Sequence, residues 1–319
     1  MNYIKGFTYG WMSGRGSFRS PEARESLRLM QERTGSTTVI FALAALQDTP
    51  HSTKVDYRGE HIVEDDELIV MLDYARSLGL KLIMKPTVNC RNGTWRAHIN
   101  FFDEDVPCEP KWHEWFASYT DYQRHYARIA EQTGCEMMIV GCEMVQTERR
   151  SAEWRQLIAD VRQDYAGLIT YNTDKYQENN VKWWDAVDVI SSSGYYPIND
   201  WDHQLDRIES VIRPYNKPFF FAEAGCPSRS GSAMIPNDWE WAGTVNPGEQ
   251  ADYYMAMFSA CKTRPWVSGF GLWDWSAALY REEEALNHDG YSVYGKPAEH
   301  VIREFYTSLP NDVQNNTVK

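Results

Sequence analysis

Short apolar, β-prone runs alternate with helical patterns from one end of the chain to the other. This alternation is typical of βα units that build a parallel sheet, and eight such runs are enough to close the sheet into a barrel. The sequence therefore predicts an α/β fold, a single (β/α)8 TIM barrel. The predicted strands cover residues 3–9, 37–43, 80–86, 137–143, 168–172, 187–193, 218–223 and 267–273.

The predicted helices begin and end at known signals. Ser20 can cap the first helix, Pro21 fits its first turn, and Gly35 closes it. No linker or change of composition divides the chain, so we expect one catalytic barrel over residues 1–310 and a polar tail over 311–319. Further helices are predicted near residues 64–78, 112–133, 151–164, 202–214, 248–263 and 297–307, with a short one near 181–185.

Long segments follow the third, seventh and eighth predicted strands, at residues 87–111, 224–247 and 274–296. The segments that enter strands are short. In barrels of this kind the loops after the strand C-termini form the catalytic face. We therefore expect a substrate cleft between these long, aromatic-rich loops.

The charge and composition narrow the class of partner. A net charge of −13 argues against nucleic acid and against an anionic membrane as partners, because both require basic surface. Hydrophobic residues make up 43% of the chain, enough for a sizeable core. Aromatic residues make up 14%, which fits either a large aromatic core or a cleft whose rings stack on sugars.

Cysteine and histidine patterns argue against disulfides and metals. The six cysteines form no CxxC pair, so we expect reduced thiols, and the eight histidines form no HxH or HExxH motif, so no catalytic metal is expected. No basic-then-apolar leader precedes the first strand, which favours a cytoplasmic protein; a secreted protein in trimmed form is the alternative.

Two of the apolar runs end in glutamate. Glu143 follows MIVGC, and Glu223 ends FFFAE, while Asp174 and Asp274 are further acids at strand ends. A lone carboxylate inside a buried strand is costly, whereas at the C-terminal end it emerges at the catalytic face. Two carboxylates there match acid–base chemistry on a glycosidic bond, about 5–5.5 Å apart in a retaining enzyme. The alternative is that each pairs with a nearby Arg or Lys.

A series of motifs in order makes the chain resemble a known family. It is similar to glycoside hydrolase family 113, β-mannanases of the barrel clan with the acid/base on strand 4 and the nucleophile on strand 7. The matching segments span nearly the whole chain: KGFTYGWMSGRG, KPTV, RNGTWRAHI, GCEM, WRQLIADVR, WWDAVDVISSSGYYPI, FAEAGCPSRSG, GLWDW and GKPAEHVI.

The resemblance implies roles for individual residues. Glu143 would be the general acid/base and Glu223 the nucleophile. Tyr195 resembles the tyrosine that hydrogen-bonds the nucleophile in this clan, although the register also admits Tyr196. Trp273 matches the aromatic floor beneath the sugar at the cleavage point.

Several other residues are candidates for substrate binding. Trp95 and Trp11 could be further sugar platforms, and Lys85 and Asn172 end strands where polar groups could bind sugar hydroxyls. Cys142 departs from the family, which tends to have a small polar residue such as Thr before the acid/base. A thiol is the weaker hydrogen-bonding group, so this change concerns substrate detail.

The sequence thus predicts a retaining glycoside hydrolase that cleaves β-1,4-mannosidic linkages in manno-oligosaccharides or mannan and needs no cofactor. Its partner is an oligosaccharide, and nothing in the chain indicates an oligomeric state. An exo-acting β-mannosidase or another β-glycosidase would share both glutamates. A non-catalytic glycan-binding barrel would need only the aromatics, and a metal-dependent barrel hydrolase would need histidines at strand ends.

Overall fold

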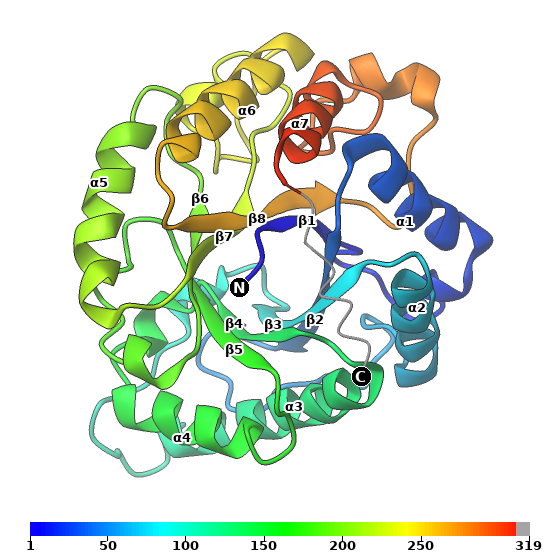
Figure 1. Ribbon diagram of the computed structural model, residues 1–319. Helices are drawn as coiled ribbons and strands as arrows, with labels where there is room; N and C mark the ends of the chain where they lie inside the picture. The colour runs from blue at the N-terminus through cyan, green and yellow to red at the C-terminus, as the bar shows by residue number, and fades with distance from the viewer. Residues whose placement is uncertain (311–319) are drawn as a thin grey trace, which may run out of the picture.

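Eight parallel strands close into a barrel, in the order β1 to β8 around the ring (Figure 1). The computed structural model describes residues 1–310. The predicted (β/α)8 barrel is confirmed, and the tail expected at 311–319 lies outside the described residues. The strands are β1 (Ile4–Tyr9), β2 (Thr38–Gln47), β3 (Lys81–Cys90), β4 (Met137–Cys142), β5 (Leu168–Thr173), β6 (Ile190–Gly194), β7 (Phe219–Ala224) and β8 (Val267–Trp275).

Helices surround the barrel, and the first of them begins and ends at the predicted residues. The Ser20 side chain accepts a hydrogen bond from the backbone of Ala23 at 3.1 Å, and Gly35 closes the helix in a left-handed conformation (φ 71°). The α-helices are α1 (Pro21–Thr34), α2 (Asp65–Ser77), α3 (Trp112–Thr133), α4 (Ser151–Val161), α5 (Trp201–Ile212), α6 (Pro247–Lys262) and α7 (Pro297–Ser308). Between β5 and β6 the described chain has only a 3-10 turn, η4 (Trp184–Ala186).

Several element ends differ from the sequence prediction. β2 and β3 both run four residues beyond their predicted ends, because they pair with each other from Ala44 and Thr87 to Gln47 and Cys90. This pairing belongs to two strands together and is invisible in either run alone. β6 starts at Ile190, later than predicted, and α4 ends sooner.

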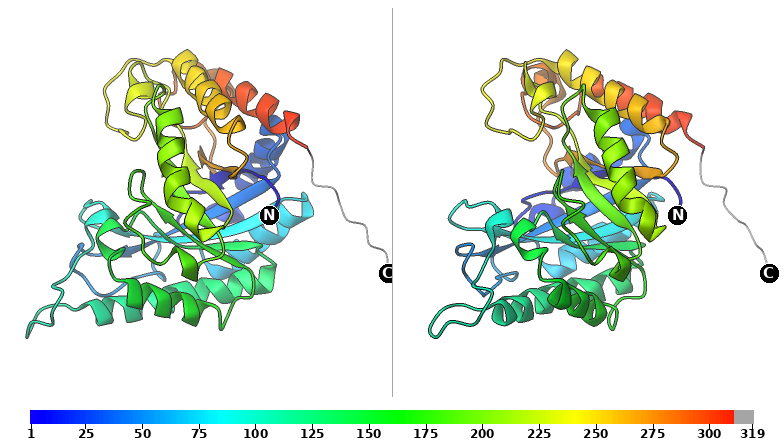
Figure 2. Two further views of the ribbon diagram at one scale, coloured as in Figure 1. Left: turned by 60° about the vertical axis from the view of Figure 1, so that its left-hand side comes forward. Right: turned by 90° about the vertical axis from the view of Figure 1, so that its left-hand side faces the viewer.

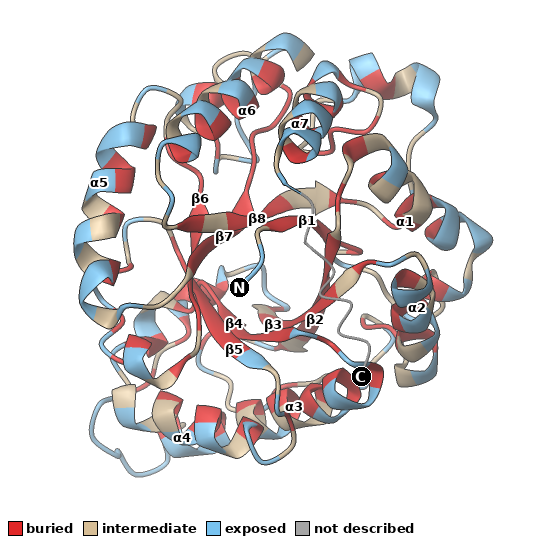
Figure 3. Ribbon diagram, viewed as in Figure 1, coloured by how far each residue is buried: buried red, intermediate tan, exposed pale blue. Residues whose placement is uncertain are grey.

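The core has two parts, one outside and one inside the barrel. A large aromatic and aliphatic core lies between strands and helices. A smaller apolar cluster fills one end of the barrel interior, and Figure 3 shows that most of the strand residues of the barrel are buried. The interior cluster consists of Ile4, Ile40, Ile83, Met137, Ile139, Val189, Phe220 and Ala222.

The long loops after β3 and β7 project from the same side of the barrel. Both views in Figure 2 show them opposite the N-terminus, where the strands end. This places two of the three predicted insertions together on one face.

Two further sequence expectations bear on the described chain. All six cysteines are free thiols, as expected. Within residues 1–310, none of the helices combines the length and the apolar character needed to cross a bilayer.

Candidate active site

Glu143 reaches the barrel interior through an irregularity in β4. Ile139 pairs with Thr170 and Cys142 with Asn172, so β4 uses three steps where β5 uses two. Such a bulge re-aims the residues after it. If side chains alternated strictly along β4 from Ile139, the Cys142 side chain would point out of the barrel. The extra residue turns this side chain inward.

Two local features accommodate this bulge. Gly141 faces packed rings, since an added Cβ would lie 2.8 Å from atoms of both Trp154 and Tyr171. Glu143 then adopts a left-handed backbone (φ 52°), which costs a non-glycine residue on the order of 1–2 kcal/mol. The backbone N–H of Glu143 donates to the Asn172 carbonyl at 2.7 Å and holds this turn.

Glu223 depends on a second bulge, in β7. Phe221 faces the helices, with its ring 5.4 Å from that of Trp201, whereas Phe220 and Ala222 belong to the interior cluster. Alternation would therefore point Glu223 outward with Phe221. Ser192 and Ser193 of β6 instead pair with Phe221 and Glu223, which leaves Ala222 as the extra residue and turns Glu223 inward.

The two glutamates face each other at the strand ends. Both are buried, and an oxygen of Glu143 and an oxygen of Glu223 lie within 4.8 Å of each other. Each also pairs with a cation: Arg96 Nη2 lies 2.7 Å from Glu143 Oε2, and Lys85 Nζ forms a short ion pair with Glu223 Oε1. Each glutamate therefore pairs with a nearby cation and also faces the other glutamate. The sequence had presented these two arrangements as alternatives.

Arg96 is a site residue that the sequence reasoning missed. It is buried, donates from Nε to the Cys142 carbonyl at 2.8 Å, and places Nη2 3.2 Å from Cys142 Sγ and 2.7 Å from Glu143. It lies in a 3-10 turn, η2 (Arg96–His98), inside the long loop after β3. Only its place within RNGTWRAHI could have pointed to it.

Ser193 is a second site residue that no sequence pattern indicated. Its hydroxyl donates to Glu143 Oε1 at 2.7 Å, and it accepts from the Asn172 amide at 3.0 Å. Glu143 is thus fixed from two sides, by Arg96 on one oxygen and by Ser193 on the other.

Glu223 is held in its ionised form. Burial alone would raise its pKa, but Lys85 and Arg96 outweigh burial and lower the pKa below its ordinary value. Burial raises the pKa of the Cys142 thiol, which therefore stays protonated and can donate to Glu223 Oε1 at 3.2 Å. Tyr195 donates to the other oxygen, Oε2, at 3.0 Å.

Tyr195 and Tyr196 have separate partners. Tyr195 contacts Glu223, whereas Tyr196 donates to Glu178 Oε1 at 2.8 Å. The structure thus places Tyr195 at the nucleophile candidate and Tyr196 outside the pair.

Lys85 and Asn172 lie behind the glutamates. Both are fully buried, and Lys85 Nζ also donates to Asn172 Oδ1 at 3.1 Å. Their contacts fix Glu223 and, through Ser193, Glu143; a direct contact with sugar hydroxyls stays a prediction.

The predicted aromatic platforms lie at different depths. The half-buried rings of Trp11 and Trp273 meet edge to face at 5.2 Å. Lys85 Nζ lies 5.9 Å from the Trp273 ring centre, and the Arg96 guanidinium lies 5.8 Å from that of Trp11. Both rings therefore border the carboxylate pair. Trp95 is more exposed and packs against the ring of His98, and its platform role stays a prediction.

The other strand-end acids also lie near the pair. Burial, with the charge of Glu143 nearby, raises the pKa of Asp174 to about 7. Burial and the charge of Glu223 raise the pKa of Asp274 to about 6. The pair therefore has protonatable neighbours on both sides near neutral pH.

Comparison with known proteins identifies the family of the chain. The sequence model of Glycoside Hydrolase Family 113 matches residues 7–296. The chain belongs to glycoside hydrolase family 113.

Solved structures of family 113 enzymes resemble the chain along its whole length. A GH113 β-1,4-mannanase structure and a complex structure of a GH113 β-1,4-mannanase are each 68% identical, with a TM-score of 0.96, over 97% of this chain and 100% of theirs. The GH113 β-mannanase AaManA from Alicyclobacillus acidocaldarius, in complex with ManMIm, is 44% identical with a TM-score of 0.93, over 97% and 98%. No curated protein matches the chain.

One cluster in this family 113 enzyme has the composition of a metal site. Cys142, Glu143 and Glu223 each offer a ligand atom, and these atoms lie within 4.8 Å of one another. Arg96 and Lys85 already bind the two carboxylates, so an added cation would meet two positive charges. The cluster is better suited to a neutral ligand.

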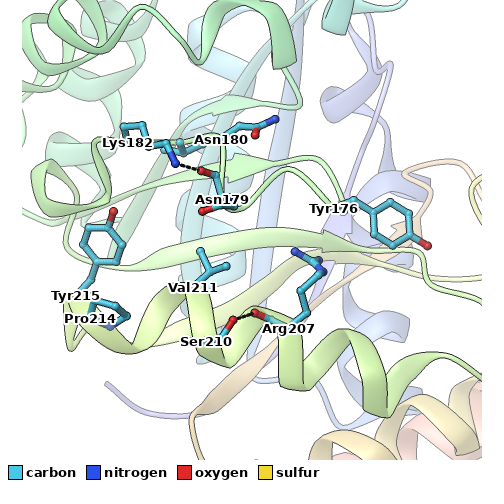
Figure 4. Close-up of a pocket in the computed structure, with 10 residues that line it drawn as sticks. Tyr176, Asn179, Asn180, Lys182, Arg207, Ser210, Val211, Pro214 and Tyr215 are labelled. Atoms are coloured by element: carbon cyan, nitrogen blue, oxygen red, sulfur yellow. Dashed lines mark hydrogen bonds between the residues drawn. The ribbon is translucent and has the colours of Figure 1, made fainter.

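A separate hollow of about 620 Å³ lies on the outer wall of the family 113 barrel (Figure 4). Tyr176, Arg207 and Tyr215 are among its lining residues, from the segment after β5, from α5 and from η5 (Arg213–Tyr215). Its lining includes neither of the two glutamates. It occupies the part of the wall where η4 replaces an α-helix.

Proposed function

We propose that this family 113 enzyme hydrolyses β-1,4-mannosidic linkages with retention of anomeric configuration. The observation that carries the proposal is the proximity of the two carboxyl groups: one oxygen of Glu143 and one oxygen of Glu223 lie within 4.8 Å of each other. Retaining glycosidases place their carboxyl groups about 5–5.5 Å apart, whereas inverting enzymes leave about 6.5–9.5 Å for a water. The relatives named β-1,4-mannanase support the choice of linkage.

Glu223 is the proposed nucleophile. Lys85, Cys142 and Tyr195 hold it with hydrogen bonds, and its lowered pKa keeps it ionised. Its carboxylate would bond to the anomeric carbon as the bond from that carbon to the leaving oxygen breaks.

Glu143 is the proposed acid/base. In the first step its proton passes to the leaving oxygen. In the second, a water attacks the anomeric carbon, Glu143 takes the proton of that water, and the ester to Glu223 breaks. One water is consumed per linkage, and both carboxyl groups return to their starting state.

The rings of Trp11 and Trp273 supply the proposed platform for the sugar. Both border the carboxylate pair, and an aromatic face suits the apolar face of a pyranose.

Rescue by azide separates the two roles. With an aryl β-mannobioside that carries an activated leaving group, Glu143→Ala should still form the glycosyl-enzyme, which azide then attacks to give the β-mannosyl azide. In Glu223→Ala, azide should replace the missing carboxylate on the opposite face and give the α-mannosyl azide. NMR of the two products tests the assignment, and the reverse pattern would exchange the roles.

The products of mannohexaose digestion distinguish internal from terminal cleavage. We expect an early mixture of mannobiose, mannotriose and mannotetraose from an endo-acting enzyme. Mannose and mannopentaose as the only early products would instead favour the exo-acting β-mannosidase.

A further inference from the structure

The turn that carries Glu143 is held by two neighbouring residues of β5. The backbone N–H of Glu143 donates to the Asn172 carbonyl at 2.7 Å. The next backbone N–H, that of Met144, donates to the Tyr171 hydroxyl at 3.0 Å. Glu143 and Met144 lie beyond the last residue of β4, and Glu143 has a left-handed backbone. The position of the proposed acid/base therefore depends on two consecutive hydrogen bonds to β5.

A buried carboxyl group fixes the direction of the Tyr171 hydroxyl. Tyr171 donates to Glu148 Oε1 at 3.0 Å, so a lone pair of the Tyr171 oxygen is left to accept from Met144. Thr173 donates to the same oxygen of Glu148 at 2.7 Å. Tyr171 and Thr173 are fully buried, and Glu148 is 1% exposed. A chain of hydrogen bonds thus runs from Glu148 through Tyr171 to the backbone N–H that follows Glu143.

The surroundings of Glu148 favour a neutral carboxylic acid. Burial raises its pKa to about 8, and the charges of Asp174 and Glu178 add to this effect. Both donors bind Oε1, and none of residues 1–310 donates a hydrogen bond to Oε2. An ionised oxygen without a partner is costly to bury, so Oε1 acts as the carbonyl oxygen of the neutral acid. A glutamine side chain offers the same carbonyl oxygen in the same shape.

The support of this hydrogen-bond chain lies outside the barrel interior. The Trp183 indole N–H donates to the Glu148 carbonyl at 3.0 Å, and the Trp183 ring is stacked on that of Trp154 at 5.0 Å. The Tyr171 ring packs against both of these rings, which belong to the core between strands and helices. Tyr171 and Glu148 therefore reach Glu143 through its backbone, whereas its carboxyl group faces the interior.

We propose that Tyr171 and Glu148 are positioning residues for the acid/base, which hold the backbone of Glu143 so that its carboxyl group meets the leaving oxygen. This inference rests on the role proposed for Glu143. Both residues are buried behind Glu143, and neither of them bonds to Glu223. Their loss should therefore slow protonation of the leaving group, because a misplacement of about 1 Å can cost roughly 100-fold in rate.

The dependence on the leaving group tests the proposal. Tyr171→Phe keeps the ring and removes the hydroxyl that binds Met144. For phenyl β-mannobioside, whose leaving group needs protonation, we expect kcat/KM to fall about tenfold. For dinitrophenyl β-mannobioside, which needs no acid, kcat/KM reports the attack of Glu223 alone and should change less than about twofold. Glu143→Ala should show the same contrast between the two substrates, with a larger loss.

Substitutions of Glu148 test whether its carbonyl oxygen orients Tyr171. Glu148→Gln keeps that oxygen, and kcat/KM for phenyl β-mannobioside should stay within about twofold of the wild type. Glu148→Leu removes the acceptor and should reproduce the contrast seen in Tyr171→Phe. A loss in Glu148→Gln as large as that in Glu148→Leu would overturn the role of Glu148.

Tyr165→Phe is the matched control. Tyr165 is also buried, and its hydroxyl donates to the Cys135 carbonyl at 2.8 Å, before the opposite end of β4. This variant should lower Tm and leave the ratio of kcat/KM for the two substrates unchanged. An equal fall for both substrates in Tyr171→Phe, or no fall in either, would overturn the positioning role alone. Full activity of Glu143→Ala on phenyl β-mannobioside would instead overturn the proposed function.

Discussion

The barrel interior has two halves built from the same strands. Apolar side chains fill one half, and charged side chains fill the other. On β3, Ile83 belongs to the apolar cluster, while Lys85, two residues further on the same face, pairs with Glu223. Both side chains are almost fully buried. One half excludes water with hydrocarbon, and the other compensates buried charge with opposite charge.

The charged half is an expensive way to fill a barrel. Buried ion pairs often stabilise a fold less than hydrophobic residues of similar volume would. The apolar half shows that this sequence can fill the same barrel with Ile, Met, Val and Phe. Function therefore explains why the charged half is kept although it stabilises the fold less, whereas the apolar half contributes mainly to stability.

Removing one charge from the charged half should have the largest effect. Lys85→Met leaves Glu223 buried without its cation, which we expect to lower the free energy of unfolding by about 3–5 kcal/mol at neutral pH. The pKa of Glu223 should rise, so the acidic limb of the kcat/KM profile should move to higher pH. Denaturant unfolding and pH–rate profiles measure both effects.

The double variant Lys85→Met/Glu223→Gln provides the matched control. With both charges removed, most of the lost stability should return, whereas activity should be absent because the nucleophile is missing. The pH dependence has a defined sign: the lowered pKa of Glu223 stabilises the wild type above the ordinary carboxyl pKa, and this stability is lost as pH falls. A single variant as stable as the wild type, with an unmoved pH profile, would contradict this picture.

A substitution in the apolar half should lower the stability of the protein and leave its activity nearly unchanged. Ile83→Ala removes a buried side chain beneath Lys85, and we expect the free energy of unfolding to fall by about 2–5 kcal/mol. At a temperature where the variant stays folded, kcat should change less than twofold. A fall in kcat well beyond twofold would show that the two halves are not separate in function.

Substitution of Cys142, which lies at the boundary between the two halves, should have the smallest effect in free energy. Cys142→Ala removes one weak donor to Glu223 and one contact to Arg96, so kcat/KM should fall roughly fivefold, about 1 kcal/mol. Cys142→Ser keeps a donor and should retain most of the activity. Equal losses in both variants would indicate that the volume of the sulfur matters more than its hydrogen bond.

The sequence predicted the parts of this picture that depend on local pattern. Ser20, Pro21 and Gly35 bound α1 as expected, and the position of Glu143 at a strand end indicated the catalytic face. The strand ends of β2 and β3 were wrong because they depend on mutual pairing.

The geometry of the barrel interior could not be predicted from the sequence, because it depends on how the strands pair in the folded protein. Neither bulge has a sequence signal, because an extra residue in a strand is defined only against the register of its neighbour. Arg96 was missed because a loop residue some distance in sequence from Glu143 enters the site only through folding. Lys85 was found, but its zero exposure and its ion pair with Glu223 are properties of packing.

The central claim is that Glu143 and Glu223 act as a retaining pair, and the configuration of the first product tests it most directly. Mannohexaose is mixed with the enzyme, and proton NMR follows the new reducing end before mutarotation. A retaining enzyme should release the β anomer of the new reducing end first. The α anomer should appear only as the sugar equilibrates. Initial release of the α anomer would contradict it.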